Sequence, residues 1–188
     1  LKMKKEEAVT LAITNNDGYL EGLISIGDIA SSDMDVYDNT IVSKANTSFK
    51  NIVDTLDGKV VAGNVEGNFS SGKVFIGANT PDMMDEYLSE GDLVILGNRF
   101  ESQYFAIEKG VRCIVLGSSS TVSPIIKRRA EEKGCIIISS PYDTFTIAKL
   151  IAQSMPVKYF MFTKDLLTFS IDDFTNDVKE TMAKNRHR

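Results

Sequence analysis

Ser25 and Asp28 are the residues whose types and spacing best suit chemistry, because they lie three positions apart where an apolar strand runs into a helix. In the stretch Gly22-Leu-Ile-Ser-Ile-Gly-Asp-Ile29, the serine falls at the helix cap and the aspartate in the first turn. The free N–H groups and the positive dipole end of a helix attract phosphate, and a carboxylate can accept hydrogen bonds from ribose. Ordinary capped helices show the same spacing, so anion binding and simple capping are both open interpretations.

A hairpin precedes this junction. Val9 to Thr14 predicts a short strand, Asn15-Asn-Asp-Gly18 a tight turn, and Tyr19 to Ser25 the return strand. Together with a helix on either side, the order over residues 1–33 resembles the second half of a CBS motif, the module named after cystathionine β-synthase. The resemblance implies that the serine contacts the phosphate and the aspartate contacts the ribose of an adenine nucleotide.

Composition restricts the class of protein. Of 188 residues, 43% are apolar and 25% charged, as in globular proteins with a sizeable core. No apolar run reaches the ~20 residues that span a bilayer, and a net charge of −5 argues against broad nucleic-acid or membrane-surface binding. His187 is the only histidine, which excludes a multi-histidine metal site. Cys113 and Cys135 lie in apolar runs, which predicts buried thiols and a cytoplasmic protein.

The middle of the chain alternates apolar strands with amphipathic helices. The pattern predicts strands at 59–62, 73–76, 92–96, 112–116 and 135–139, and helices ending at Leu56, Glu90, Lys109, Lys133 and Gln153. Continuous Val/Ile/Leu strands between helices predict an α/β domain whose mostly parallel sheet is covered on both faces.

Polar residues gather where these strands end, which is where parallel sheets usually bind ligands. Asn98 and Arg99 follow one strand, and Ser118 and Ser119 follow the next, so these four are candidate anion or dimer contacts. Turn and cap chemistry is an equal alternative. No histidine within this domain is available to activate a serine, and paired carboxylates are absent from the strand ends, so the sequence predicts no catalytic residues.

Val94 to Gly117 carries a second resemblance. A strand ending in Gly-Asn-Arg, followed by a helix and by Glu-Lys-Gly-Val before another strand, resembles the core of a DRTGG domain. The resemblance covers residues 48–152 and includes Pro141-Tyr-Asp-Thr144 before the last helix. The Asp-Arg-Thr-Gly-Gly signature is replaced here by Asn98-Arg-Phe-Glu-Ser102, which keeps only the arginine. The fold of that family is therefore implied, and a ligand role for the signature is left open.

The run Met161 to Ser170 begins a third pattern. It predicts an entry turn, a short strand at 166–169, and a helix over 171–184 capped by Ser170. This order resembles the first half of a CBS motif. The resemblance implies that the backbone around Leu166 lines an adenine pocket and that Thr168 contacts the nucleotide.

Basic residues flank both partial motifs. Arg186, His187 and Arg188 follow the last predicted helix, and Lys4 and Lys5 hold the comparable place before the hairpin. By the CBS resemblance these side chains reach the nucleotide phosphates. A solvated helix end is the alternative interpretation.

The three resemblances divide the chain into residues 1–47, the end of one CBS motif with a linker; 48–152, a DRTGG domain; and 153–188, a linker with the start of a second motif. This order resembles the regulatory region of CBS-containing family II inorganic pyrophosphatases, and both motifs being cut predicts a piece of a longer protein. The resemblance implies a homodimer inhibited by AMP or ADP and activated by ATP or diadenosine polyphosphate. Manganese or cobalt is expected only in a catalytic part that this chain lacks.

Other functions remain open. An oligomerisation scaffold without nucleotide binding is one alternative interpretation, and a regulatory module of another enzyme is a second. DRTGG-type domains also resemble the N-terminal part of some phosphate acetyltransferases, but no candidate nucleophile here has a base beside it.

Overall fold

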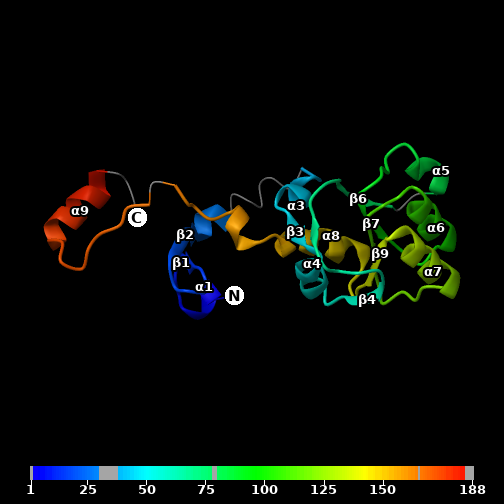
Figure 1. Ribbon diagram of the computed structural model, residues 1–188, viewed down its shortest axis with the longest axis horizontal. Helices are drawn as coiled ribbons and strands as arrows, with labels where there is room; N and C mark the ends of the chain where they lie inside the picture. Colours follow the sequence, from blue (N-terminus) through cyan, green and yellow to red (C-terminus); the bar gives the residue numbers. More distant parts are fainter. Residues whose placement is uncertain (1, 30–37, 78–79, 165, 185–188) are drawn as a thin grey trace. The chain divides into compact units, whose positions relative to one another are not determined.

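The computed structural model describes residues 2–29, 38–77, 80–164 and 166–184. The chain divides into two compact units, one made of residues 1–30 with 160–188 and the other of residues 31–159 (Figure 1). Segments from both ends of the sequence therefore share one unit, and the middle of the chain forms the other.

A five-stranded sheet in the order β4-β9-β8-β7-β6 forms the centre of the larger unit. Its strands are β4 (Lys59–Ala62), β6 (Val74–Ile76), β7 (Leu93–Leu96), β8 (Cys113–Leu116) and β9 (Ile136–Ser139). The last four are parallel, and β4 runs antiparallel to β9 at the edge. The expectation of a mostly parallel sheet is confirmed. A separate antiparallel pair joins β3 (Thr47–Ser48) to β5 (Asn68–Phe69).

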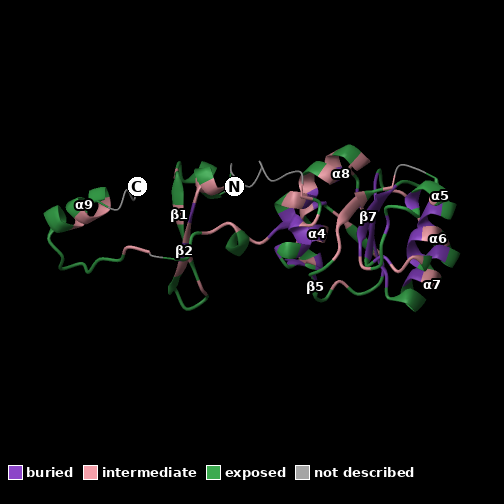
Figure 2. Cartoon of the chain, turned by 90° about the horizontal axis from the view of Figure 1, so that it is seen from above, coloured by how far each residue is buried: buried purple, intermediate pink, exposed green. Residues whose placement is uncertain are grey.

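Helices cover both faces of this sheet (Figure 2). On one face lie α5 (Pro81–Met84), α6 (Phe100–Glu108) and α7 (Pro124–Lys133). On the other lie α4 (Phe49–Thr55), α8 (Thr144–Leu150) and the 3-10 turn η1 (Ile151–Ser154), against which α3 (Ile41–Lys44) packs. A second 3-10 turn, η2, spans Val157–Tyr159. Among the described residues no helix is long and apolar enough to cross a membrane.

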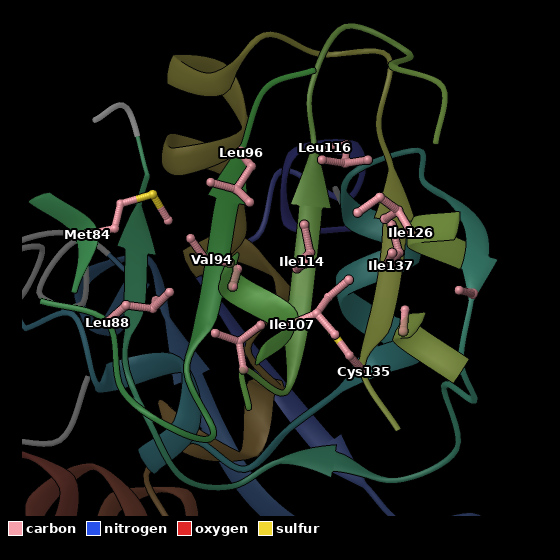
Figure 3. Packing of buried hydrophobic residues seen from close by; sticks show 14 residues of the cluster. Met84, Leu88, Val94, Leu96, Ile107, Ile114, Leu116, Ile126, Cys135 and Ile137 are labelled. Carbon is pink, nitrogen blue, oxygen red and sulfur yellow. The ribbon is translucent and has the colours of Figure 1, made fainter. Parts of the chain in front are cut away.

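The core follows from the two-residue alternation of each strand. Val94 and Leu96 of β7 belong to one cluster with Ile107 of α6, and Ile126 of α7 lies beside Ile137 of β9, as Figure 3 shows. Ile95, between these two strand positions, is also fully buried, because the opposite face of the sheet is covered as well. Burial of each such side chain contributes roughly 1.5–3 kcal/mol to the stability of the folded domain. The packed core therefore fixes the positions of the strand ends.

Local capping sets where several helices begin. The Ser48 hydroxyl accepts a hydrogen bond from the Asn51 N–H at 3.1 Å, so α4 starts at Phe49, directly after this cap. Ser123 accepts from the Ile126 N–H at 3.3 Å at the start of α7. Asp143 accepts from the N–H groups of Phe145 and Thr146 at 2.9 and 3.0 Å at the start of α8.

The helix predicted to end at Glu90 is wrong in its length, since α5 ends at Met84, and the Thr80 side chain before it makes no cap. The buried carboxylate of Asp92 accepts from the Ser89 N–H at 2.9 Å and from the Lys73 N–H at 2.9 Å. Because the Ser89 N–H binds this side chain instead of a helical carbonyl, the chain turns into β7 at that point.

The smaller unit contains the predicted hairpin. β1 (Thr10–Thr14) pairs antiparallel with β2 (Leu20–Ser25), after the short helix α1 (Lys2–Lys5). The Asn15 side chain accepts from the Asp17 and Tyr19 N–H groups at 3.0 and 2.9 Å, and Gly18 supplies a φ of +85°. An Asx turn and a left-handed glycine thus close the hairpin.

The predicted strand at 166–169 is wrong, because these residues lie outside any strand. The predicted helix start is also displaced, since α9 spans Thr175–Lys184. The Asp173 carboxylate accepts from the Ser170 N–H at 2.8 Å, and the Ser170 hydroxyl accepts from the Asp172 N–H at 3.3 Å. This local turn uses the polar groups that were expected to start the helix.

Candidate functional site

Ser25 and Asp28 lie where β2 passes into a helical turn at residues 26–29. The Asp28 carboxylate accepts from the Ser25 N–H at 2.7 Å and from the Ser25 hydroxyl at 2.8 Å. The Asp28 N–H in turn donates to the Ser25 hydroxyl oxygen at 3.2 Å. The two half-buried residues therefore form a reciprocal capping box.

This capping box uses donors that were expected to bind phosphate. The N–H groups of Ser25 and Asp28 have acceptors within the box, and the Ile26 N–H donates to the Val9 carbonyl at 3.0 Å. A ribose hydroxyl that binds Asp28 must therefore replace the Ser25 hydroxyl as the donor to the Asp28 carboxylate. The geometry allows this exchange, since both side chains keep partial contact with solvent.

The second partial motif reaches the first through Phe162, whose backbone forms an isolated antiparallel bridge with Leu23. The Phe162 N–H donates to the Leu23 carbonyl at 2.7 Å, and the Leu23 N–H donates to the Phe162 carbonyl at 2.9 Å. The approach requires Gly22, because a Cβ there would lie 2.7 Å from the Phe162 carbonyl oxygen and 3.0 Å from the Met161 sulfur. Phe162 is thereby held beside the strand that carries Ser25.

The remaining predicted nucleotide contacts are less closely tied to this junction. Lys4 and Lys5 end α1 with exposed side chains, Leu166 is half-buried and Thr168 is exposed. Within the described residues no hydrogen bond joins any of these four to Ser25 or Asp28. Arg186, His187 and Arg188 lie outside the described residues.

The four candidate anion contacts lie at strand ends of the larger unit, and the two pairs differ in whether their groups are already hydrogen-bonded. The Ser118 N–H donates to the Tyr142 carbonyl at 2.7 Å and the Ser119 N–H to the Ser140 carbonyl at 2.8 Å, with both residues at positive φ. Their amides are thus committed to the fold, and only their exposed hydroxyl groups face solvent. Asn98 and Arg99, in contrast, line a shallow pocket of about 290 Å³ where α6 begins.

Ser102 and Thr144 line the same pocket, and sequence analysis did not select either residue. Serine as the third residue of a helix gives no distinguishing signal, and Thr144 reaches this place from α8, far along the chain. Only the juxtaposition of β7, α6 and α8 brings these hydroxyl groups together.

The described residues contain no group of three or more His, Cys, Asp or Glu side chains that could hold a metal ion. Both cysteines are buried free thiols, as predicted. Burial raises the pKa of Cys135 to about 12 and the pKa of Cys113 well above its usual value. Such thiols are poor nucleophiles at neutral pH.

Comparisons with known proteins identify relatives of both units. The model of the DRTGG domain matches residues 51–154. A cobalt-dependent inorganic pyrophosphatase of Clostridium perfringens is 34% identical over 98% of this chain and 34% of its own length. A probable manganese-dependent inorganic pyrophosphatase of Thermotoga maritima is 29% identical over 74% of this chain and 25% of its own length. The chain therefore spans about a third or less of these relatives.

A solved structure is similar over nearly the whole chain. It contains the CBS and DRTGG domains of the regulatory region of the Clostridium perfringens pyrophosphatase, complexed with the activator diadenosine tetraphosphate. The TM-score is 0.91, with 34% sequence identity over 98% of this chain and 80% of that one. A mixed α/β fold with a DRTGG domain between CBS segments is thus shared.

Proposed function

The chain belongs to the DRTGG domain family, and on that premise we propose that it is the adenine-nucleotide-sensing regulatory region of an inorganic pyrophosphatase. One observation carries the proposal: the similar regulatory region of known structure is complexed with a diadenosine activator, and the similarity covers 98% of this chain. The hydrolytic chemistry and its manganese or cobalt ions belong to a catalytic part outside these residues.

The proposed nucleotide site is centred on Ser25 and Asp28. Ser25 presents a hydroxyl group to a phosphate, and the carboxylate of Asp28 exchanges its bond to that hydroxyl for bonds to ribose. Lys4, Lys5 and the basic residues at 186–188 supply positive charge, and Leu166 and Thr168 contribute from the second motif. The backbone bridge between Leu23 and Phe162 supports the pairing of the two motifs around one ligand.

Regulation requires that ligands bind two conformations with different affinity. AMP and ADP are proposed to favour a less active state of the enzyme, and ATP or a diadenosine polyphosphate a more active one. A coupling free energy of ~1–3 kcal/mol is typical of such effects. The cytoplasm is the proposed compartment, consistent with two free thiols.

A homodimer is part of the proposal. Within the described part of the hairpin unit only Gly22 and Ile24 are buried, and Tyr19 is 73% exposed. Such an exposed sheet face is stabilised when further structure packs on it. The motifs of a second copy of this chain can pack there through a two-fold interface. The boundaries 1–47, 48–152 and 153–188 remain the proposed division into motif, DRTGG domain and motif.

Calorimetric titration of the chain with AMP and diadenosine tetraphosphate tests nucleotide binding, and light scattering tests the dimer. Pyrophosphate hydrolysis by the whole protein, measured with and without each nucleotide, tests regulation. Heat of binding at millimolar AMP and a nucleotide-dependent rate are expected. A dimer that binds no nucleotide would instead support the scaffold interpretation, and nucleotide binding without pyrophosphate hydrolysis would indicate another enzyme.

A further inference from the structure

The pocket at the carboxyl ends of β6 and β7 has no part in the proposed nucleotide site. We propose that it binds a phosphate-type oxyanion, held by the start of α6 together with Arg99, Ser102 and Thr144. The pocket holds about 290 Å³, which is ample for a phosphate group. It lies wholly within the larger unit of the chain.

The start of α6 supplies backbone donors. Arg99 occupies the cap position in an extended conformation and makes no side-chain cap, and the first helical bond runs from the Gln103 N–H to the Arg99 carbonyl at 3.1 Å. In the part of the chain that the structure describes, the N–H groups of Phe100, Glu101 and Ser102 meet no acceptor. A nine-residue helix that begins this way offers an oriented dipole and three free donors to an anion.

The Ser102 hydroxyl is the second, independent sign of a ligand. Ser102 is only 3% exposed, yet its hydroxyl has no hydrogen-bond partner among the described residues. No fully buried side-chain N or O atom lacks a partner in this same part of the chain, so the Ser102 oxygen must keep access to the pocket it lines. Its neighbour Gln103, equally buried, is satisfied by donating to the Gly97 carbonyl at 3.1 Å.

The Ser102 oxygen meets solvent at the pocket that it lines, so an acceptor bound there can take its hydrogen bond in place of water. An oxyanion in the pocket would accept from Ser102 at no further desolvation of that side chain. The space in front of Gly97 is open, since a Cβ built there meets no atom within 4 Å. The side chains of Arg99 and Thr144 make no hydrogen bond or ion pair with the described residues and remain available.

Nearby carboxylates set the expected strength of binding. Asp143 adjoins Thr144, but its carboxylate already accepts from two N–H groups and from the Thr146 hydroxyl at 2.7 Å. These hydrogen bonds, first that of the Thr146 side chain, lower the pKa of Asp143, which therefore stays charged and engaged with α8. Glu101 in the first turn of α6 opposes an anion. Because Arg99 is opposed by the negative charges of Asp143 and Glu101, we expect weak binding that depends on the oriented N–H donors of α6.

Amide NMR of the whole chain, titrated with inorganic phosphate against sodium chloride of equal ionic strength, tests the site. We expect saturable shifts at residues 100–102 with phosphate and none with chloride. Separate titrations with pyrophosphate and AMP show whether the phosphate group is bound free or as part of a nucleotide. Linear shifts that are equal in phosphate and chloride would overturn the proposal.

Three variants sharpen the result. Arg99→Gln should weaken phosphate binding roughly tenfold or more, because a charge-assisted contact is lost. Ser102→Ala should weaken it several-fold while the melting temperature stays unchanged, since the Ser102 hydroxyl makes no hydrogen bond with the described residues. Arg128→Gln removes the same charge from a side chain that is 83% exposed on α7, and should leave binding unchanged. A Ser102→Ala protein that melts lower and binds phosphate normally would show a packing role instead.

Discussion

Leu23 and Phe162 exchange two backbone hydrogen bonds, of 2.7 and 2.9 Å, although they come from opposite ends of the sequence. This bridge is the point at which the two partial CBS motifs meet within one unit. Its integrity is therefore a condition for a nucleotide site that draws residues from both motifs.

Gly22→Ala should break this bridge. The added methyl group would lie 2.7 Å from the Phe162 carbonyl oxygen, and overpacking of this kind costs about 1–3 kcal/mol. Hydrogen exchange should accelerate at the Leu23 and Phe162 amides, and AMP affinity should fall. The pairing of Leu11 with Ile24 within the hairpin serves as the internal control and should stay protected. Unchanged exchange at Phe162 would show that the bridge does not depend on this glycine.

Asp28→Ala should remove charge-assisted bonds to ribose that contribute ~1.5–3 kcal/mol. AMP affinity should therefore fall roughly tenfold to a hundredfold. Asp173→Ala is a matched control, because Asp173 forms a similar turn with Ser170 but is not a proposed nucleotide contact. If both variants lose stability alike and neither loses affinity, Ser25 and Asp28 only cap a helix.

Ser140→Ala should destabilise the larger unit by about 1–3 kcal/mol, because a buried carbonyl loses its donor. The fully buried Ser140 hydroxyl donates to the Leu56 carbonyl at 2.7 Å and accepts from the Tyr142 N–H at 3.3 Å. Denaturant unfolding measures the loss. Ser71→Ala, at an exposed position, should leave the free energy of unfolding unchanged.

Asp38 should titrate at an unusually low pH. The hydrogen bond from Lys44, of 2.6 Å, and those from Thr40 lower its pKa from 3.8 to about 2. Because the folded-state pKa is below the unfolded value, the stabilisation is complete above about pH 4 and is lost as the pH falls toward 2. Carboxyl NMR should show the pKa rising in Lys44→Met. Lys50→Met, whose partner is Glu66, should leave the Asp38 titration unchanged.

Cys113 and Cys135 should resist thiol reagents at pH 8 in the native protein. Burial raises both pKa values, that of Cys135 to about 12, so almost no thiolate is present and access is blocked. Labelling measured by absorbance should follow the unfolding transition in urea. Rapid reaction of either thiol before unfolding would contradict the buried, protonated state.

Features that depend on a few neighbouring residues were predictable. Continuous aliphatic runs indicated the strands 93–96 and 113–116 because both faces of a parallel sheet must be apolar. Ser48 and the Asn-Asn-Asp-Gly turn at 15–18 act over two to four positions, so the local sequence is enough to predict their hydrogen bonds. Helix boundaries failed where a side chain competed locally, as Asp92 does for the Ser89 N–H.

By itself, then, the sequence determined the order along the chain of the strands in the five-stranded sheet, the cap that begins α4, the turn that closes the hairpin, and the chemical character of each strand end. Only the tertiary structure decided which distant groups meet: Leu23 with Phe162, Ser140 with the Leu56 carbonyl, and Ser102 with Thr144 around one pocket. Capping depends on groups within one turn of the chain, and a sequence displays them side by side. A long-range partner depends on how packed faces align in space, and no periodicity along the chain encodes that alignment.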